Sequence, residues 1–169
     1  TYAARADEGG VLRDLIHEID YTTWLFGRPA AVCCTLQDGL RLQIASEAGA
    51  DLLWQAPGDV SVSLRLDYLS RIPRRQLRAH GAWGDLTWDA IAQTVTLECP
   101  GQAPIQEACA QTREAMMTDQ FASFLTAITG QPAPELATLD DGAFAISLCD
   151  AARRSATIGH EETILPWQT

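Results

Sequence analysis

Lysine is missing from this sequence of 169 residues, and all twelve basic side chains are arginines. A reaction that needs a lysine amine would have to take it from elsewhere. The sequence also has no signal peptide and no apolar run long enough to cross a bilayer. Its five cysteines show no CxxC spacing, which is typical of a reducing compartment. We therefore expect a cytoplasmic protein.

Metal ligands are scarce as well. No Cys or His residues stand at ligand spacing, and the adjacent Cys33 and Cys34 would point to opposite faces of a strand. We therefore expect no metal site and interpret the cysteines as small buried hydrophobic residues. The formal net charge of -10 argues against nucleic acid or a membrane surface as a partner, because phosphates repel an acidic protein.

The composition favours a globular protein. Hydrophobic residues make up 47% of the sequence, and a chain of this length can bury a core without disulfides or metal. It contains no repeat, low-complexity segment or linker. We therefore expect one domain spanning residues 1–169.

The stretch from Gly9 to Gly27 predicts one helix over residues 11–26. Its apolar residues recur on one arc of a helical wheel. The opposite arc is polar and carries Arg13, Asp14, His17, Asp20, Tyr21 and Trp24. Gly27 suits the position just after a helix, and the Arg28–Pro29 sequence prevents continuation.

The middle of the chain has strand patterns joined by short turns. Strands are expected at residues 31–36, around the alternating Leu40, Leu42 and Ile44, and at 52–55, 60–68, 76–80, 85–89 and 94–98. Pro57-Gly58-Asp59 and Gly81-Ala82-Trp83-Gly84 are hairpin turns in this interpretation. Strands that follow one another so closely form a mainly antiparallel sheet.

The last third returns to helical periodicity. Phe121, Phe124, Leu125 and Ile128 form a stripe that we expect in the core. Thr138 resembles a helix N-cap, and residues 143–155 continue as helix. The predicted fold class is α+β, a mainly antiparallel open sheet with helices on one face.

The polar face of the first helix is a candidate site for proton transfer. His17 is the candidate acid–base group, because histidine is the residue type most often used for proton transfer, and Asp14 and Asp20 lie one turn on either side of it. Asp14 could orient His17 or bind a substrate hydroxyl, while Arg13 and Tyr21 stand four residues before and after His17. The alternative is a surface histidine among solvated charges.

A second cluster surrounds residues 68–78. Tyr68, Arg71 and Arg74 are candidate substrate contacts, because guanidinium groups bind phosphate and carboxylate in a bidentate manner. The alternative is a charged edge that discourages strand pairing.

Three stretches together resemble one family. They are the GG…D…HxxD helix at residues 9–20, the hairpins at 51–68 and 75–89 with their G-x-x-G turn, and residues 121–130 followed by Asp140-Asp141-Gly142. In this order they resemble the C-terminal domain of the Gfo/Idh/MocA family, named after glucose–fructose oxidoreductase, inositol dehydrogenase and MocA. Nearly the whole chain is covered.

This resemblance implies a two-domain, NAD- or NADP-dependent oxidoreductase acting on a sugar, polyol or nucleotide sugar. The Rossmann domain that binds the cofactor and the family's Glu-Lys-Pro lysine are both absent from this chain. We therefore expect a C-terminal substrate-binding domain, inactive alone, that pairs with its own N-terminal Rossmann domain and forms a homo-oligomer through the open sheet face.

The resemblance assigns residue roles as well. It implies catalytic roles for His17 and Asp14. The expected substrate-binding residues are Arg13, Asp20, Tyr21, Tyr68, Arg71 and Arg74. One departure concerns the aspartate and the histidine, which many members separate by four residues and this chain by three. That departure keeps a second hypothesis open, a non-catalytic homologue that binds sugar-like ligands or serves in assembly.

Overall fold

The computed structural model describes residues 2–5 and 9–166, and these divide into two compact units. Unit 1 comprises the described parts of residues 1–70 and 137–169, and unit 2 is Arg71–Leu136. Unit 2 is thus inserted in the sequence between two segments of unit 1. The expectation of a single domain over residues 1–169 remains a prediction.

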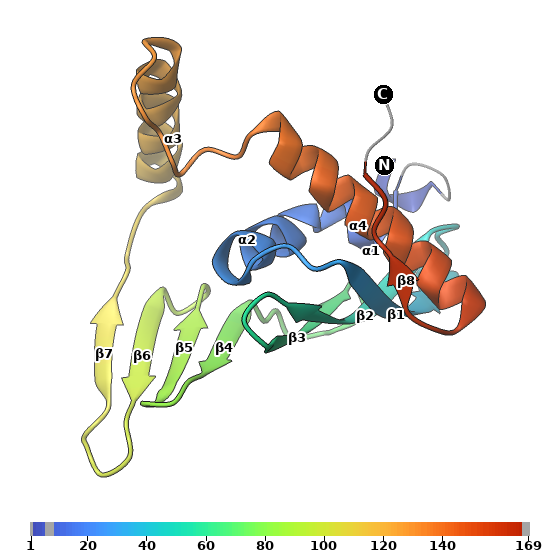
Figure 1. Ribbon diagram of the computed structural model, residues 1–169, viewed down its shortest axis with the longest axis horizontal. Coiled ribbons are helices and arrows are strands. Elements are labelled where there is room, and N and C mark those ends of the chain that lie inside the picture. Colours follow the sequence, from blue (N-terminus) through green and yellow to red (C-terminus); the bar gives the residue numbers. More distant parts are fainter. Residues whose placement is uncertain (1, 6–8, 167–169) are drawn as a thin grey trace. The chain divides into compact units, whose positions relative to one another are not determined.

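Unit 1 is built on a four-stranded antiparallel sheet with the strand order β3-β2-β1-β8 (Figure 1). Its strands are β1 (Ala31–Asp38), β2 (Glu47–Ala56), β3 (Val60–Asp67) and β8 (Glu162–Thr163). The hairpin of β2 and β3 pairs Trp54 with Val62, as the Pro57-Gly58-Asp59 turn predicts.

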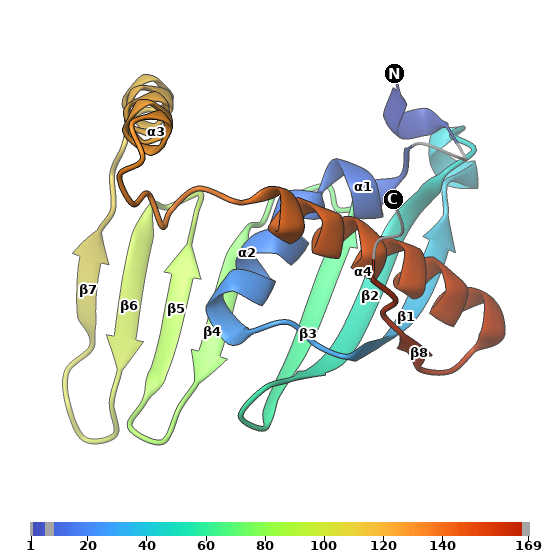
Figure 2. The ribbon, with the colours of Figure 1, turned by 45° about the horizontal axis from the view of Figure 1, so that its top comes forward.

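Helices cover one face of this sheet (Figure 2). They are α1 (Val11–Asp14), α2 (Ile16–Phe26) and α4 (Leu139–Ile158), and the short 3-10 turns η1 (Tyr2–Ala4) and η2 (Leu40–Leu42) complete the unit. Helix α4 packs on β1, α1 packs on β2, and α2 packs against α4. Leu12, Leu52 and Leu148 are almost completely buried between helices and sheet. The predicted α+β class, with helices on one face, is confirmed.

The first helix differs from its prediction, because it is broken. Helix α1 ends at Asp14 and α2 begins at Ile16, with Leu15 between them at φ -103° and ψ 27°. The end of α2 is as predicted, since Gly27 adopts φ 91° and its N–H donates to the Thr23 carbonyl. The prediction of one uninterrupted helix over 11–26 is therefore wrong at a single residue.

A second local prediction is also wrong. Leu40 and Leu42 do not lie in a strand but in the 3-10 turn η2, which ends at Gln43 in the left-handed conformation. Leu40 is 77% exposed, so the alternation of leucines here does not mark a buried strand face. The strand that follows, β2, begins only at Glu47.

Unit 2 contains a second antiparallel sheet with the order β4-β5-β6-β7, followed by the helix α3. Its elements are β4 (Gln76–His80), β5 (Asp85–Asp89), β6 (Thr94–Glu98), β7 (Ile105–Ala108) and α3 (Arg113–Ile128). The first three strands lie where the sequence predicts them, whereas β7 was not predicted.

The β4–β7 sheet is amphipathic. The strand registers place Leu77, Ala79, Leu86, Trp88, Val95, Leu97 and Ile105 on one face. The other face is polar and carries Arg78, His80, Asp85, Thr87, Thr96, Glu98 and Gln106. All of residues 71–136 are described, and none of them is buried.

The expectation that the Phe121–Ile128 stripe belongs to the core is contradicted. Phe121 is 60% exposed and Ile128 is 65% exposed. The stripe does lie on a helix, as predicted, and this helix begins after its N-cap Thr112, which was not predicted. Helical periodicity identifies which side of a helix is apolar, but it does not show whether another part of the protein covers this side.

Candidate functional site

The glycine pair at the start of α1 is a structural junction. Gly10 adopts φ 92°, a conformation that L-residues rarely adopt, and a Cβ there would overlap the Glu47 carboxylate. Glu47 accepts a hydrogen bond from Arg153 of α4 at 2.9 Å, and Arg153 also donates to the Gly9 carbonyl at 2.6 Å. The pair therefore fixes where α1 begins relative to α4 and β2.

Asp14 lies at the last position of α1, next to the break. The hydroxyl of Tyr68, just after β3, donates a hydrogen bond to Oδ2 of Asp14 over 3.0 Å. Both side chains are half-buried. The structure thus brings together two predicted site residues that are 54 positions apart in the sequence.

His17 lies in the first turn of α2, and its side chain is 54% exposed. Its Nε2 is 3.1 Å from Oε1 of Glu18, whose side chain is only 12% exposed. Sequence reasoning missed Glu18, although an acidic residue directly after the candidate histidine was a visible signal. The exposed imidazole is therefore paired with a largely buried carboxylate.

Arg13 was expected to contact substrate but is engaged within the fold. Its guanidinium donates to Oδ1 of Asp150 in α4 at 2.8 Å, with both side chains about one third exposed. Its Nε is buried without a hydrogen-bond partner among the described residues. This ion pair ties α1 to α4, and a substrate role for Arg13 remains a prediction.

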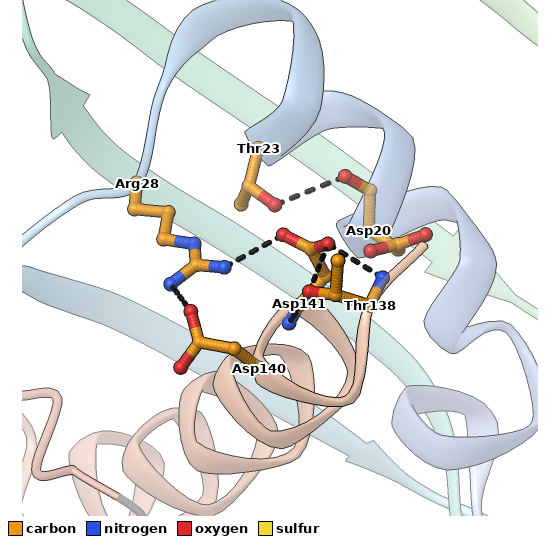
Figure 3. A network of polar contacts seen from close by, with 6 residues as sticks. All are labelled: Asp20, Thr23, Arg28, Thr138, Asp140 and Asp141. Atoms are coloured by element: carbon orange, nitrogen blue, oxygen red, sulfur yellow. Dashed lines mark hydrogen bonds and ion pairs between the residues drawn. The ribbon is translucent and has the colours of Figure 1, made fainter. Parts of the chain in front are cut away.

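Asp20 and Tyr21 follow on α2, where both are half-buried. The backbone carbonyl of Asp20 accepts a hydrogen bond from the Thr23 hydroxyl at 2.9 Å. Figure 3 shows Asp20 and Thr23 beside the start of α4. The substrate contacts expected of Asp20 and Tyr21 remain predictions.

The second predicted cluster is divided between the two units. Tyr68 belongs to unit 1, whereas Arg71 and Arg74 belong to unit 2 and are exposed. Tyr68 is directed to Asp14. Arg75, in contrast, lies with its guanidinium 5.6 Å from the centre of the Trp88 ring. The substrate role of Arg71 and Arg74 remains a prediction.

An ion-pair network joins the end of α2 to the start of α4 (Figure 3). Arg28 donates to Asp140 and to Asp141, each at 2.6 Å, and its guanidinium lies 5.0 Å from the centre of the Phe144 ring. Asp141 also accepts from the backbone N–H and the hydroxyl of Thr138, at 2.7 and 2.6 Å. We call these residues the Arg28 clasp.

The hydrogen bonds of the Arg28 clasp lower the pKa of the Asp141 carboxyl group. Hydrogen bonds from Thr138, and then from Arg28, lower the pKa of Asp141 to about 2. The two carboxylates in turn raise the pKa of Arg28. Thr138 and Asp141 form a capping box, in which each side chain accepts from the other's backbone N–H. The sequence predicted Thr138 as the N-cap of this helix, but it did not predict the contacts of Arg28 with Asp140 and Asp141.

The described residues offer little that would hold a cofactor or a metal. A shallow hollow of about 300 Å³ is lined by Arg153, Arg154, Thr157, Ile158 and Glu162, and by none of the expected site residues. No cluster of three or more potential metal ligands occurs in the described part of the chain. Among its helices, none is long and apolar enough to cross a bilayer.

Comparison with known proteins identifies the class to which this fold and helix face belong. The model of the GFO/IDH/MocA C-terminal domain matches residues 1–87, which is just over half of the chain. The chain belongs to the GFO/IDH/MocA family and contains its C-terminal domain. No curated protein sequence matches it.

Solved structures share the fold. Levoglucosan dehydrogenase in complex with NADH has a TM-score of 0.82 and 15% identity, with 99% of this chain and 54% of that chain covered. Aldose-aldose oxidoreductase from Caulobacter crescentus, complexed with glycerol, has a TM-score of 0.80 and 18% identity, with 96% and 50% covered. The chain therefore spans about half the length of these proteins.

A third similar structure has a name that describes no enzyme. It is the super-repressor mutant of Gal80p from Saccharomyces cerevisiae, with a TM-score of 0.73 and 15% identity, and 94% of this chain and 50% of that chain covered. At this level of identity the likeness concerns the fold alone. The fold therefore accommodates oxidoreductases and a repressor, and the side chains must decide between them.

Proposed function

We propose that this chain is the substrate-binding domain of an NAD- or NADP-dependent oxidoreductase that acts on a sugar, polyol or nucleotide sugar. The observation that carries the proposal is the face formed by α1 and α2. There an exposed imidazole, His17, is paired with a carboxylate, and the half-buried Asp14 lies three residues before it. Exposed acid–base groups on a fixed frame suit proton transfer to or from a bound alcohol.

The chemistry required of this chain is acceptance of a proton. Oxidation of a secondary alcohol removes a hydride from carbon and a proton from oxygen. His17 would accept the proton, and Asp14, held by Tyr68, would accept a hydrogen bond from a neighbouring substrate hydroxyl. The described residues include no glycine-rich loop between a strand and a long helix that could cradle a dinucleotide. We therefore assign cofactor binding to a separate Rossmann domain and expect the chain alone to be inactive.

Two features support a sugar-like substrate. Asp14 at the end of α1 and Asp20 and Tyr21 on α2 offer hydrogen-bonding groups, and carboxylates suit neutral hydroxyl groups better than anions. Solved structures with this fold include a levoglucosan dehydrogenase and an aldose-aldose oxidoreductase. A nucleotide-sugar substrate would give Arg71 and Arg74 a purpose as phosphate ligands.

We further propose that the whole protein forms a homo-oligomer through a sheet face. On the apolar face of the β4–β7 sheet, Leu97 and Ile105 are 37% and 56% exposed. Exposed apolar surface of this kind is typical of protein interfaces. We propose that the same face of a second copy of the protein packs against it.

The competing function is a non-catalytic domain that binds sugar-like ligands or serves in assembly. One observation favours it. Asp14 and His17 are three residues apart rather than four, and the helix is broken at Leu15 between them. Such a break alters how the two side chains face one another.

The test uses the whole natural protein, with NAD or NADP and a panel of sugars, polyols and nucleotide sugars. We expect one substrate class to reduce the cofactor, as measured by the absorbance of the reduced nicotinamide. His17→Ala should lower kcat about 100-fold or more, since a positioned acid–base group contributes about 10² to 10⁴ in rate. His80→Ala is the matched control, because His80 is 73% exposed in unit 2. A protein that binds no cofactor and reduces none favours the competing function.

A further inference from the structure

We infer that the exposed end of α2, centred on Trp24, is the surface on which the cofactor-binding domain of the whole protein docks. Trp24 and Leu25 are 71% and 50% exposed in this chain. The inference rests on the proposed function, because a nicotinamide-dependent reaction requires such a domain. It adds the place of the contact and the residue that anchors it.

Trp24 lies on the same side of α2 as His17. Helix α2 runs without interruption from Ile16 to Phe26, and positions i, i+4 and i+7 of a helix share one face. His17, Tyr21 and Trp24 have this spacing. At a rise of about 1.5 Å per residue, Trp24 stands about 10 Å along the helix from His17. The candidate acid–base group and the exposed indole therefore share one face.

The opposite side of α2 holds this face outward. Ile19, Thr22 and Thr23 are buried, and α2 packs against α4. The hydroxyl of Thr23 donates to the Asp20 carbonyl at 2.9 Å, so this buried side needs no further polar partner for it. Rotation of α2 to bury Trp24 would expose Ile19, which is completely buried. The indole is therefore a fixed part of the surface of unit 1.

The apolar surface continues onto α4. Arg28, which follows α2, binds Asp140 in the first turn of α4 (Figure 3). Leu139, directly before Asp140, is 92% exposed. The Arg28 clasp thus brings Leu139 to the end of α2 that carries Trp24 and Leu25. Apolar side chains bordered by charged groups resemble the core and the polar rim of a protein interface.

The geometry of hydride transfer identifies the occupant. A base must lie within about 2.6–3.2 Å of the substrate hydroxyl whose proton it accepts. The two carbons that exchange the hydride must approach to about 3–3.5 Å. The domain that holds the nicotinamide must therefore reach to within one substrate of His17. A domain of about 100 residues has a radius of gyration of about 13 Å, so it also covers surface around His17. The apolar part of that surface is the end with Trp24.

A second copy of this chain suits the surface less well. A copy packed on Trp24 would compete with the cofactor-binding domain for the helix face that carries His17. The subunit contact proposed above uses the β4–β7 sheet instead, which leaves this face open. This chain also spans only about half the length of the solved structures that share its fold. A protein of that length has enough further chain to cover the end of α2.

The first test uses the whole natural protein with the photoreactive amino acid p-benzoylphenylalanine in place of Trp24. Irradiation should join it to a dinucleotide-binding domain of the same polypeptide, identified by peptide mass spectrometry, with no change of mass on a denaturing gel. The same replacement at Trp83, which is 88% exposed in unit 2, is the matched control and should not reach that domain. A cross-link from position 24 to a second copy, or no cross-link there, would overturn the inference.

The second test measures the contribution of the anchor. Trp24→Ala in the whole protein should lower kcat/KM about 30-fold, the effect of truncating a hot-spot residue of an interface. Trp24→Phe should retain more of the activity, because it keeps an aromatic ring at the contact. Trp83→Ala should leave kcat/KM unchanged. Equal values for Trp24→Ala and the parent protein would exclude Trp24 as the anchor.

The proposed function and the docking surface fail in different ways. If His17→Ala leaves turnover unchanged but position 24 cross-links to a dinucleotide-binding domain, the catalytic role of His17 is wrong and the docking surface stands. If His17→Ala lowers turnover and position 24 gives no cross-link to that domain, only the docking surface is overturned.

Discussion

Tyr68 and Asp14 join the end of the β2–β3 hairpin to the end of α1 through one hydrogen bond of 3.0 Å. Asp14 is the last residue of α1, directly before the break at Leu15. Its carboxylate is therefore held by a residue that follows strand β3 and not only by its own helix. This relationship assigns Tyr68 a role that its sequence position did not suggest. It orients Asp14, whether or not it also contacts substrate.

Removal of the Tyr68 hydroxyl should therefore weaken the fold at this junction. We expect Tyr68→Phe to lower the free energy of unfolding by about 1.5–3 kcal/mol, the range for a hydrogen bond to a charged group. Urea denaturation measures this loss. In a double-mutant cycle with Asp14→Ala, the two changes should be non-additive by about 1 kcal/mol. Full additivity would mean that the bond does not form in solution.

Ser155 should be the most sensitive serine of α4. It is completely buried, its hydroxyl donates to the His160 carbonyl at 2.7 Å, and it accepts from the Cys34 N–H at 2.9 Å. Ser155→Ala leaves two backbone groups without this partner, which should cost about 1–3 kcal/mol of stability. The exposed Ser63 of β3 is the control, and Ser63→Ala should change stability by less than about 0.5 kcal/mol. Equal effects of the two variants would contradict the structural role of Ser155.

The Arg28 clasp makes stability depend on pH in the acid range. The pKa of Asp141 is lowered to about 2 in the folded chain, from a usual value of 3.8. A lowered folded pKa contributes stability above the usual value, and this contribution is lost as pH falls toward about 2. Asp141→Asn should therefore show a shallower decline of thermal midpoint between these pH values than the parent chain. If the thermal midpoint falls equally in both proteins, the Arg28 clasp is not the source of the pH dependence.

The cysteines should differ sharply in reactivity. Burial raises the pKa of Cys34 and of Cys149 to about 12, so both remain thiols at pH 8 and are shielded from reagents. Cys109 is exposed. We expect iodoacetamide to label Cys109 in the native chain and to reach Cys34 and Cys149 only after denaturation, as peptide mass spectrometry can measure. Native labelling of Cys34 would contradict its packing beneath α4.

The apolar face of the β4–β7 sheet predicts an effect on assembly. In the whole protein, Leu97→Glu places a charge within the proposed interface and should lower the molar mass measured by light scattering. Thr96→Glu adds the same charge to the opposite, polar face of the same strand, and it should leave the mass unchanged. An unaltered mass in both variants would exclude this face as the subunit contact.

Local patterns in the sequence predicted much of the fold. The strands β4, β5 and β6 lie at the predicted residues, because alternation and a glycine-containing turn specify a hairpin over a few positions. Gly27 and Thr138 end and begin helices as predicted for the same reason. The break at Leu15 could not be predicted, since its backbone angles depend on what packs against α1. The exposure of Phe121 could not be predicted either, because amphipathicity does not show whether the apolar side of a helix is covered.

The members of the candidate site remain predictions, and the sequence did not indicate which residues they contact. His17 and Asp14 were identifiable by residue type and spacing. The partner of Arg13, however, is Asp150, which is 137 positions away. The partners of Arg28 are 112 and 113 positions away. Ion pairs of this kind form only when distant segments meet, so the sequence did not indicate the partners of either arginine.

The insertion of unit 2 between β3 and α4 has a consequence for synthesis on the ribosome. The face of β1 that carries Val32 and Cys34 is covered by α4, which is more than 100 positions later in the chain. Until α4 emerges, a nascent chain must leave that apolar face open while residues 71–136 are translated. Closing so long a loop is slow compared with forming a hairpin. During this interval the nascent chain exposes apolar surface that the finished fold buries.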